Sequence, residues 1–171
     1  MGVFAVFGWV LLACAMPDLA PRTLSMDRHA PDLFVALVAY LALRSDGLDV
    51  VPWAIAIGVA QDCASLDPLG THAFVLGFVG FVFARREGAS SRARVRGPGL
   101  GITIAGAALL AHVLYVVRMI PVLRTGPSFV GLLAGAPAAL WTAVFAWPLL
   151  ALLDRAHAFD GVTGRPRGLP A

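Results

Sequence analysis

The sequence has few charged residues: they make up 13% of its 171 residues, whereas 59% are hydrophobic. A soluble domain typically has about 25% charged and about 45–50% apolar residues. A single core of this size could not bury so much apolar surface. The composition therefore argues against a soluble enzyme, and also against a disordered chain, which requires low hydrophobicity and high net charge. It favours an integral membrane protein.

Lysine is absent, and all 13 basic residues are arginine, which gives a net charge of +3. The arginines lie between apolar runs, as in the loops of membrane proteins, and form no basic stripe interleaved with aromatic residues. We therefore expect the lipid bilayer, and no nucleic acid, as a partner. No basic residue precedes the first apolar run, so we expect a retained membrane helix there rather than a cleaved signal peptide.

Cysteine is scarce, and the residue patterns of catalytic and metal sites are missing. Cys14 and Cys63 match no zinc or redox spacing and lie in or beside apolar runs, so we expect two buried, free thiols. His72 and His112 each lie in an apolar run and are expected to be packing residues. The sequence has no local signature of a catalytic triad and no phosphate-binding glycine loop. It predicts no enzymatic activity, no metal and no cofactor.

Long apolar stretches predict an all-α integral membrane protein, a compact bundle of about six transmembrane helices in a single domain, residues 1–153. A membrane-spanning helix needs roughly 17–25 mostly apolar residues. The candidate spans are residues 2–19, 31–44, 50–64, 71–84, 99–117 and 127–153. The second to fourth are short for a full span, which leaves three possibilities: they tilt little, they thin the bilayer, or they pack as partial spans shielded by protein. Residues 154–171 are rich in Gly, Pro and Arg, which predicts a disordered cytoplasmic tail.

Prolines mark several of the predicted helix ends. Pro17 is expected to end the first helix. Pro31 is expected to occupy the first position of the second helix, with Asp32 favourable at its positive end. The last apolar stretch contains three prolines. Pro127 is expected to start the helix, whereas Pro137 and Pro148 are expected to kink it.

A basic loop after the fourth predicted span indicates the orientation. This loop contains one acid, Glu87, and five arginines: Arg85, Arg86, Arg92, Arg94 and Arg96. Because cytoplasmic loops carry an excess of Lys and Arg, these arginines are expected to determine the topology and to place the loop inside. With six spans, both termini are then cytoplasmic.

A polar pair ends the third predicted span, where Gln61 and Asp62 follow an apolar run. A charged side chain at the bilayer centre costs about 2.5–3.5 kcal/mol even on the most lenient scale. Gly58 lies four residues before Asp62, on the same helix face, and leaves room beside the carboxylate. Two interpretations stay open: a polar contact or pocket, or an acid near the outer end that meets water or a helix N-terminus.

The connection that follows has the residues of a tight turn. In Pro68-Leu69-Gly70 the proline presets the backbone and Gly70 can adopt a positive φ. Thr71 is expected to cap the fourth helix.

Three motifs in order resemble one family. A Pro-Asp pair opens the second span at Pro31, a glycine precedes Asp62 by four residues, and a Pro-Leu-Gly turn begins six residues later at Pro68. Their order and spacing resemble the bacterial rod shape-determining protein MreD family. Cys63 and Ala64 depart from the family pattern, in which leucines are expected after the aspartate.

The resemblance implies a non-enzymatic inner-membrane scaffold of the cell-wall elongation complex, or elongasome, which helps maintain cell shape during peptidoglycan synthesis. The implied partners are an MreC-like protein, the MreB filament system, a RodA-type wall synthase and the elongation-specific penicillin-binding protein. With this family in view, we expect a partner-binding or polar membrane site at Asp32, Gly58, Gln61 and Asp62.

A different class of protein stays as the alternative. MreD-like proteins resemble, in general architecture, the six-helix S-components that bind substrate in vitamin transporters. An S-component should have a pocket rich in polar and aromatic side chains near its outer face. Here only a few residues could form such a pocket, namely Trp53, Gln61, Asp62 and Asp67. Their small number favours the scaffold.

Overall fold

The computed structural model describes residues 2–24, 31–45, 47–65, 67–85, 98–123 and 135–155. These residues form the helices α1 (Gly2–Leu24), α2 (Leu33–Arg44), α3 (Val50–Ala64), α4 (Thr71–Arg85), α5 (Pro98–Leu123) and α7 (Gly135–Arg155), with a 3-10 turn, η1 (Gly47–Asp49), before α3. No strand occurs in the described part of the chain. The prediction of an all-α protein is confirmed.

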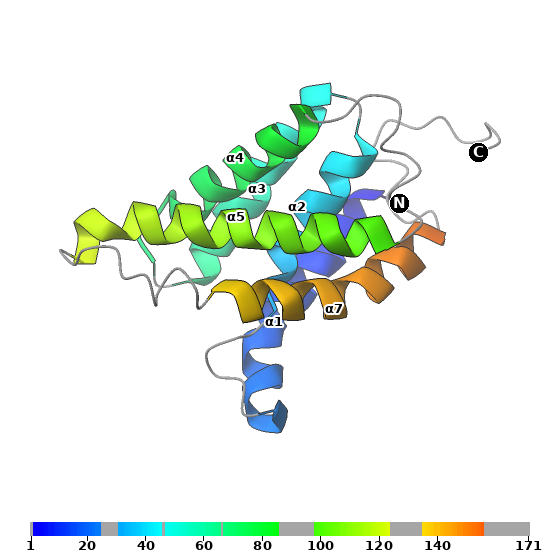
Figure 1. Ribbon diagram of the computed structural model, residues 1–171, viewed down its shortest axis with the longest axis horizontal. Coiled ribbons are helices and arrows are strands. Elements are labelled where there is room, and N and C mark those ends of the chain that lie inside the picture. Colours follow the sequence, from blue (N-terminus) through cyan, green and yellow to red (C-terminus); the bar gives the residue numbers. More distant parts are fainter. Residues whose placement is uncertain are drawn as a thin grey trace.

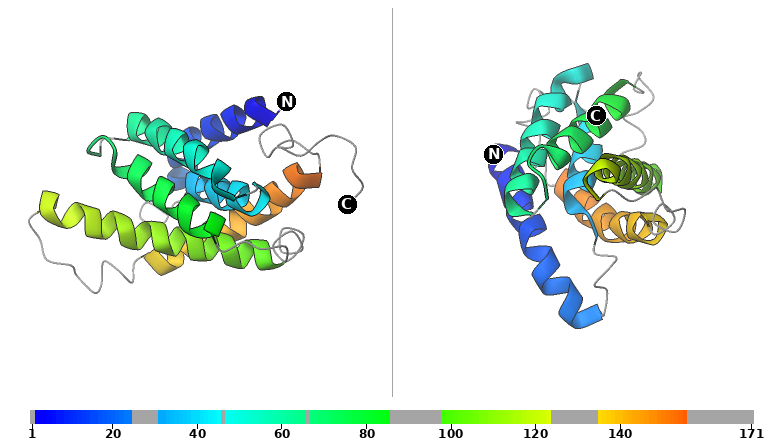
Figure 2. Two further views of the ribbon diagram at one scale, coloured as in Figure 1. Left: turned by 90° about the horizontal axis from the view of Figure 1, so that it is seen from above. Right: turned by 90° about the vertical axis from the view of Figure 1, so that its left-hand side faces the viewer.

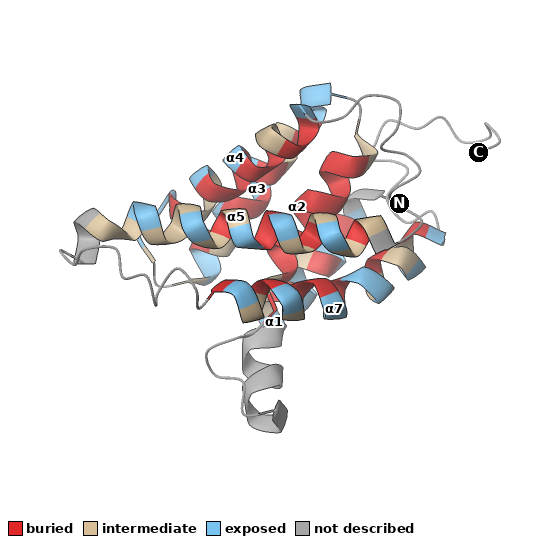
Figure 3. Ribbon diagram, viewed as in Figure 1, coloured by how far each residue is buried: buried red, intermediate tan, exposed pale blue. Residues whose placement is uncertain are grey.

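Helix α2 forms the centre of the bundle. It packs between the α3–α4 pair and the α5–α7 pair, and α1 covers another side of it (Figures 1 and 2). Residues 33–43 are all buried (Figure 3). At about 1.5 Å per residue, this 12-residue helix extends roughly 18 Å, less than the hydrocarbon core of about 30 Å. Of the three possibilities for short spans, the burial of α2 favours a partial span shielded by protein.

Within the described residues, two helices are long and apolar enough to cross a membrane, at Gly99–Ile120 and Gly135–Arg155. They run side by side in α5 and α7 and carry exposed apolar side chains such as Ile102, Leu140 and Leu152. A large exposed apolar surface is typical of a membrane or protein contact. Shorter apolar helices occur at Phe4–Ala15, Leu33–Arg44 and Thr71–Arg85, and six complete spans stay a prediction.

Helix α1 attaches to the centre through one face. Val6, Trp9 and Ala13 are buried, and their spacing of three and four residues places them on the same side of the helix. The indole N–H of Trp9 donates a hydrogen bond to the carbonyl of Leu33 at 2.7 Å. Phe4 points away and is 81% exposed, so α1 is a peripheral helix with an apolar outer face.

A buried ion pair joins the C-terminal ends of α2 and α7. The Arg44 guanidinium pairs with the Asp154 carboxylate, and the Tyr40 hydroxyl donates a hydrogen bond to the same carboxylate at 2.7 Å. The guanidinium also lies 5.8 Å from the centre of the Tyr40 ring. Both charged side chains are 10% exposed, so the pair is largely shielded from solvent.

The N-terminal helix boundaries differ in part from the predicted ones. The prediction that Pro17 ends the first helix is wrong, because α1 continues to Leu24. Helix α2 begins at Leu33, so Pro31 lies before the helix rather than at its first position. The reason is that the Asp32 carboxylate accepts hydrogen bonds from the N–H groups of Phe34 (3.0 Å) and Val35 (3.1 Å). Asp32 is therefore the N-cap of α2.

The other boundaries agree more closely, except at α5 and α7. Helix α5 begins one residue before the predicted span and continues to Leu123, six residues beyond its predicted end. Helix α3 has the predicted bounds and α4 is one residue longer. Because α7 begins at Gly135, Pro137 lies in its first turn and is no internal kink, whereas Pro148 is inside the helix. Asp154 and Arg155 end α7 rather than start a tail. Pro127 and residues 156–171 lie outside the described residues.

Two surface predictions have mixed outcomes. Cys14 and Cys63 are free thiols as expected, but neither is buried: Cys14 is half-buried and Cys63 is exposed. Cys63 follows buried Asp62 and lies on a different side of α3. Arg85 is exposed, with its guanidinium 5.0 Å from the centre of the Phe81 ring. The other four arginines of the basic loop, Arg86, Arg92, Arg94 and Arg96, lie outside the described residues.

Candidate functional site

Asp62 binds the N-terminus of helix α4. One carboxylate oxygen accepts hydrogen bonds from the N–H groups of Gly70 (2.9 Å) and Ala73 (3.2 Å), and the other accepts from the N–H of His72 (2.8 Å). The Nδ1 atom of His72 lies 3.0 Å from that second oxygen. The first N–H groups of a helix lack partners within it, and the helix dipole is positive there. Asp62, only 3% exposed, therefore joins α3 to α4.

Gly58 makes this junction possible. A Cβ atom at Gly58 would lie 2.5 Å from the Cα of Ala73 and 2.6 Å from the carbonyl oxygen of His72. Both contacts are with backbone, which cannot move aside as a flexible side chain can. The room that the sequence predicts beside the Asp62 carboxylate is thus filled by the first turn of α4.

The turn between α3 and α4 follows the prediction at Gly70 but not at Thr71. Gly70 has a φ of +88°, which favours glycine. The Thr71 hydroxyl donates a hydrogen bond to the carbonyl of Pro68 at 2.7 Å instead of accepting one from a helix N–H. The prediction that Thr71 caps α4 is therefore wrong, because Asp62 occupies that role from the preceding helix. Leu69, at the tip of the turn, is 82% exposed.

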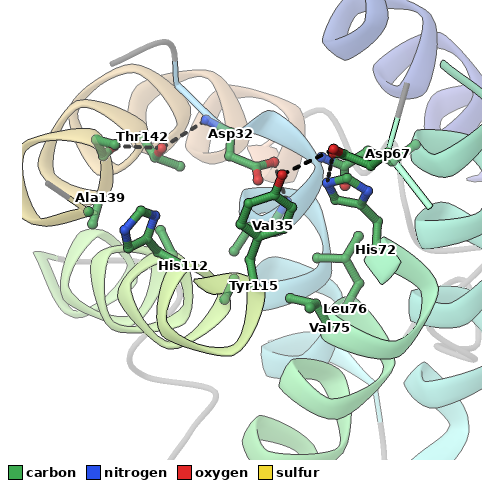
Figure 4. Close-up of a pocket in the computed structure, with 15 residues that line it drawn as sticks. Asp32, Val35, Asp67, His72, Val75, Leu76, His112, Tyr115, Ala139 and Thr142 are labelled. Atoms are coloured by element: carbon green, nitrogen blue, oxygen red, sulfur yellow. Dashed lines mark hydrogen bonds and ion pairs between the residues drawn. The ribbon is translucent and has the colours of Figure 1, made fainter. Parts of the chain in front are cut away.

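A cavity of about 290 Å³ lies in front of this junction. It is lined by the first residues of α2, α4 and α7, the last residues of α3 and the middle of α5 (Figure 4). Small-molecule sites usually measure about 300–1,000 Å³. This cavity is at the lower limit of that range, so it suits a single side chain or a small group. Apolar walls come from residues such as Val35, Leu76 and Ala108.

One side of the cavity is a linked group of polar side chains. The Tyr115 hydroxyl donates a hydrogen bond to one Asp67 oxygen at 3.1 Å, and the Nε2 atom of His72 lies 3.7 Å from the other. The rings of His72 and Tyr115 are 5.6 Å apart. Figure 4 shows these three side chains directed toward one another. Because His72 also contacts Asp62, the cap of α4 and the cavity wall share one side chain.

The opposite side joins three helices through Asp32. Its backbone N–H donates a hydrogen bond to the Thr142 hydroxyl at 2.9 Å (Figure 4), and that hydroxyl donates to the carbonyl of Ala138 at 2.8 Å. The Gln61 side chain, near the end of α3, lies close to the Asp32 carboxylate. The hydrogen bonds therefore tie the start of α2 to α7, with the end of α3 beside them.

Helices α5 and α7 approach closely at the floor of the cavity. A Cβ atom at Gly135 would lie 2.1 Å from the His112 ring, and both residues line the cavity. A larger residue at Gly135 would therefore displace the His112 ring.

The predicted site residues are brought together in two layers. Asp32 and Gln61 line the cavity, whereas Asp62 and Gly58 form the α3–α4 junction beside it. The partner-binding role of these residues stays a prediction. The cavity has further polar groups. His72 and His112 were predicted as packing residues, and Asp67 was considered only for the transporter alternative. Tyr115 and Thr142 were not predicted at all. The described residues contain no group of three or more His, Cys, Asp or Glu that could hold a metal ion.

Comparison with known protein families identifies this chain. The family model of the rod shape-determining protein MreD matches residues 1–154. No curated protein matches the chain, and neither does any solved structure. The expected likeness to the S-components of vitamin transporters is therefore without support, and the transporter alternative is not retained. The match extends from α1 to the end of α7, and the chain belongs to the MreD family of membrane proteins that determine rod shape.

Proposed function

We propose that this protein is a non-enzymatic inner-membrane scaffold of the cell-wall elongation complex, and that its cavity docks a segment of an MreC-like membrane protein. The family match supports a role in rod shape. The MreB filament system, a RodA-type synthase and the elongation-specific penicillin-binding protein are the further partners that this role implies in peptidoglycan synthesis.

One observation carries the docking proposal: a cavity with polar and apolar walls forms where three helices begin, at one end of the bundle. Its volume suits a side chain of a partner better than a vitamin-sized ligand. Asp32, Gln61 and Asp67 supply hydrogen-bonding groups, and the neighbouring Val35 and Leu76 supply apolar contact. A rigid site of this kind, built on helix ends, positions a partner without catalysing a reaction.

Filling the cavity should weaken the docking. Ala138 lines the cavity on α7, and Ala138→Leu places three extra carbons in it. Ala136, two residues earlier, is exposed and does not line the cavity, so Ala136→Leu is a matched control. We expect Ala138→Leu to reduce co-purification of the MreC-like protein by roughly tenfold, which corresponds to about 1.4 kcal/mol of binding. Equal co-purification with both variants, at equal membrane levels, would contradict the proposal.

We also propose a multi-pass topology in the bacterial inner membrane, with both termini cytoplasmic. Five arginines against one acid in residues 85–98 support this orientation. Reporter fusions after Gly88 and after His157 should both give cytoplasmic signals. The cavity, at the opposite end of α4 from Arg85, would then face the periplasm. A periplasmic signal from the Gly88 fusion would overturn the orientation.

A further inference from the structure

An acceptor without a partner lies at the cavity wall. The Oε1 atom of Gln61 is buried and accepts no hydrogen bond within the described structure. Gln61 lines the cavity together with Asp32 and Asp67. Leaving a buried acceptor unpaired costs free energy. The site therefore favours an incoming hydrogen-bond donor beside Gln61.

The charges at the cavity favour a donor that is positively charged. Asp32 and Asp67 both line it, and no Lys or Arg is among the described residues that do. Each carboxylate can accept about four hydrogen bonds. Asp67 accepts one from Tyr115 and lies near His72, so it has capacity for more. Its side chain is 29% exposed, which leaves it accessible from outside.

Asp62 contributes much less to this preference. Both of its oxygens are occupied by N–H groups at the start of α4, and the positive helix end offsets its charge. One Asp32 oxygen likewise caps the start of α2. The acceptors available to a ligand thus belong mainly to Asp67, in the α3–α4 turn, and Gln61, near the end of α3.

We propose that the cavity binds one basic side chain, an arginine or a lysine, carried by the docked partner segment. This inference rests on the proposed docking function and specifies its chemistry. The charged head lies between the Asp67 carboxylate and Gln61 Oε1, and the aliphatic stem packs on the apolar wall near Leu76. Charge-assisted hydrogen bonds of this kind are about twice as strong as neutral ones.

A small probe tests this chemistry on the purified full-length protein in detergent. N-acetyl-arginine amide carries the basic side chain, and N-acetyl-citrulline amide has nearly the same shape without the charge. At fixed ionic strength we expect the arginine probe to bind roughly tenfold more tightly than the citrulline probe. Asp67→Asn should remove most of that difference. Asp49→Asn should preserve it, because Asp49 is exposed and outside the cavity.

Equal binding of the two probes would overturn the inference. Equal effects of Asp67→Asn and Asp49→Asn would also overturn it, because they would indicate a general response to net charge. The outcome is separable from the docking test. If the arginine probe binds as expected but Ala138→Leu leaves co-purification unchanged, the docking function fails and the preference for a basic group stands. If the probe does not bind but Ala138→Leu disrupts docking, only the present inference fails.

Discussion

Asp62→Ala should lower the free energy of unfolding by roughly 3 kcal/mol, because it leaves several N–H groups at the start of α4 without a buried acceptor. Those groups belong to Gly70, His72 and Ala73. Asp62→Asn should cost less, since the amide keeps one acceptor oxygen but loses the charge that the helix end favours. Thermal unfolding in detergent and membrane abundance both measure the effect.

A second aspartate provides the matched control for this prediction. Asp49 precedes α3 at its N-cap position but makes no side-chain capping hydrogen bond, and it is exposed. Asp49→Ala removes the same charge without removing a buried contact, so we expect little change in stability. If Asp62→Ala accumulated and unfolded like Asp49→Ala, the capping role would be wrong, and direct contact with a partner would be the better interpretation of Asp62.

The other large effect is expected at the far end of the bundle. Removing one partner of a buried ion pair leaves an uncompensated charge and typically costs about 3–5 kcal/mol. We therefore expect Arg44→Ala and Asp154→Ala each to lower the free energy of unfolding by about 3 kcal/mol. Arg155→Ala, at the exposed neighbouring position, should have little effect. The result is measured by unfolding in detergent at one pH and ionic strength.

The double variant makes this prediction more specific. Arg44→Ala with Asp154→Ala removes both charges, so the loss should be clearly smaller than the sum of the single losses. The Tyr40 hydroxyl hydrogen-bonds the Asp154 carboxylate of the same pair. Tyr40→Phe should therefore lower the free energy of unfolding by about 1 kcal/mol. Additive single losses would show that the two side chains act independently.

Much of the fold was predictable because apolar runs and local turn chemistry determine it. The bounds of α3 and the positive φ of Gly70 agree with the sequence patterns. The end of α1 was not predictable from Pro17, since a proline removes one hydrogen bond yet does not always end a helix. The start of α2 depended on whether Asp32 would act as a cap or as a first-turn residue, which local sequence alone leaves open.

The candidate site was predictable only in part, because its side chains meet through tertiary structure. Asp62 stood out as an acid in an apolar run, but the sequence left two interpretations open: a polar contact or pocket, or an acid that meets water or a helix N-terminus. Its carboxylate binds the N-terminus of α4, as in the second interpretation. Tyr115 and Thr142 belong to α5 and α7, and no local motif connects them to Asp67 or Asp32. Their roles depend on helix packing that brings residues 48 and 110 positions apart into contact.

Photo-crosslinking in cells tests the central claim, docking at the cavity, most directly. A benzophenone amino acid at Tyr115 would lie in the cavity wall, and the same residue at Val117, which is exposed on α5 and outside the cavity, is the control. The docking account predicts a covalent adduct with the MreC-like protein from position 115 and little or none from position 117. An adduct from position 117 alone, with both proteins present at normal levels, would contradict it.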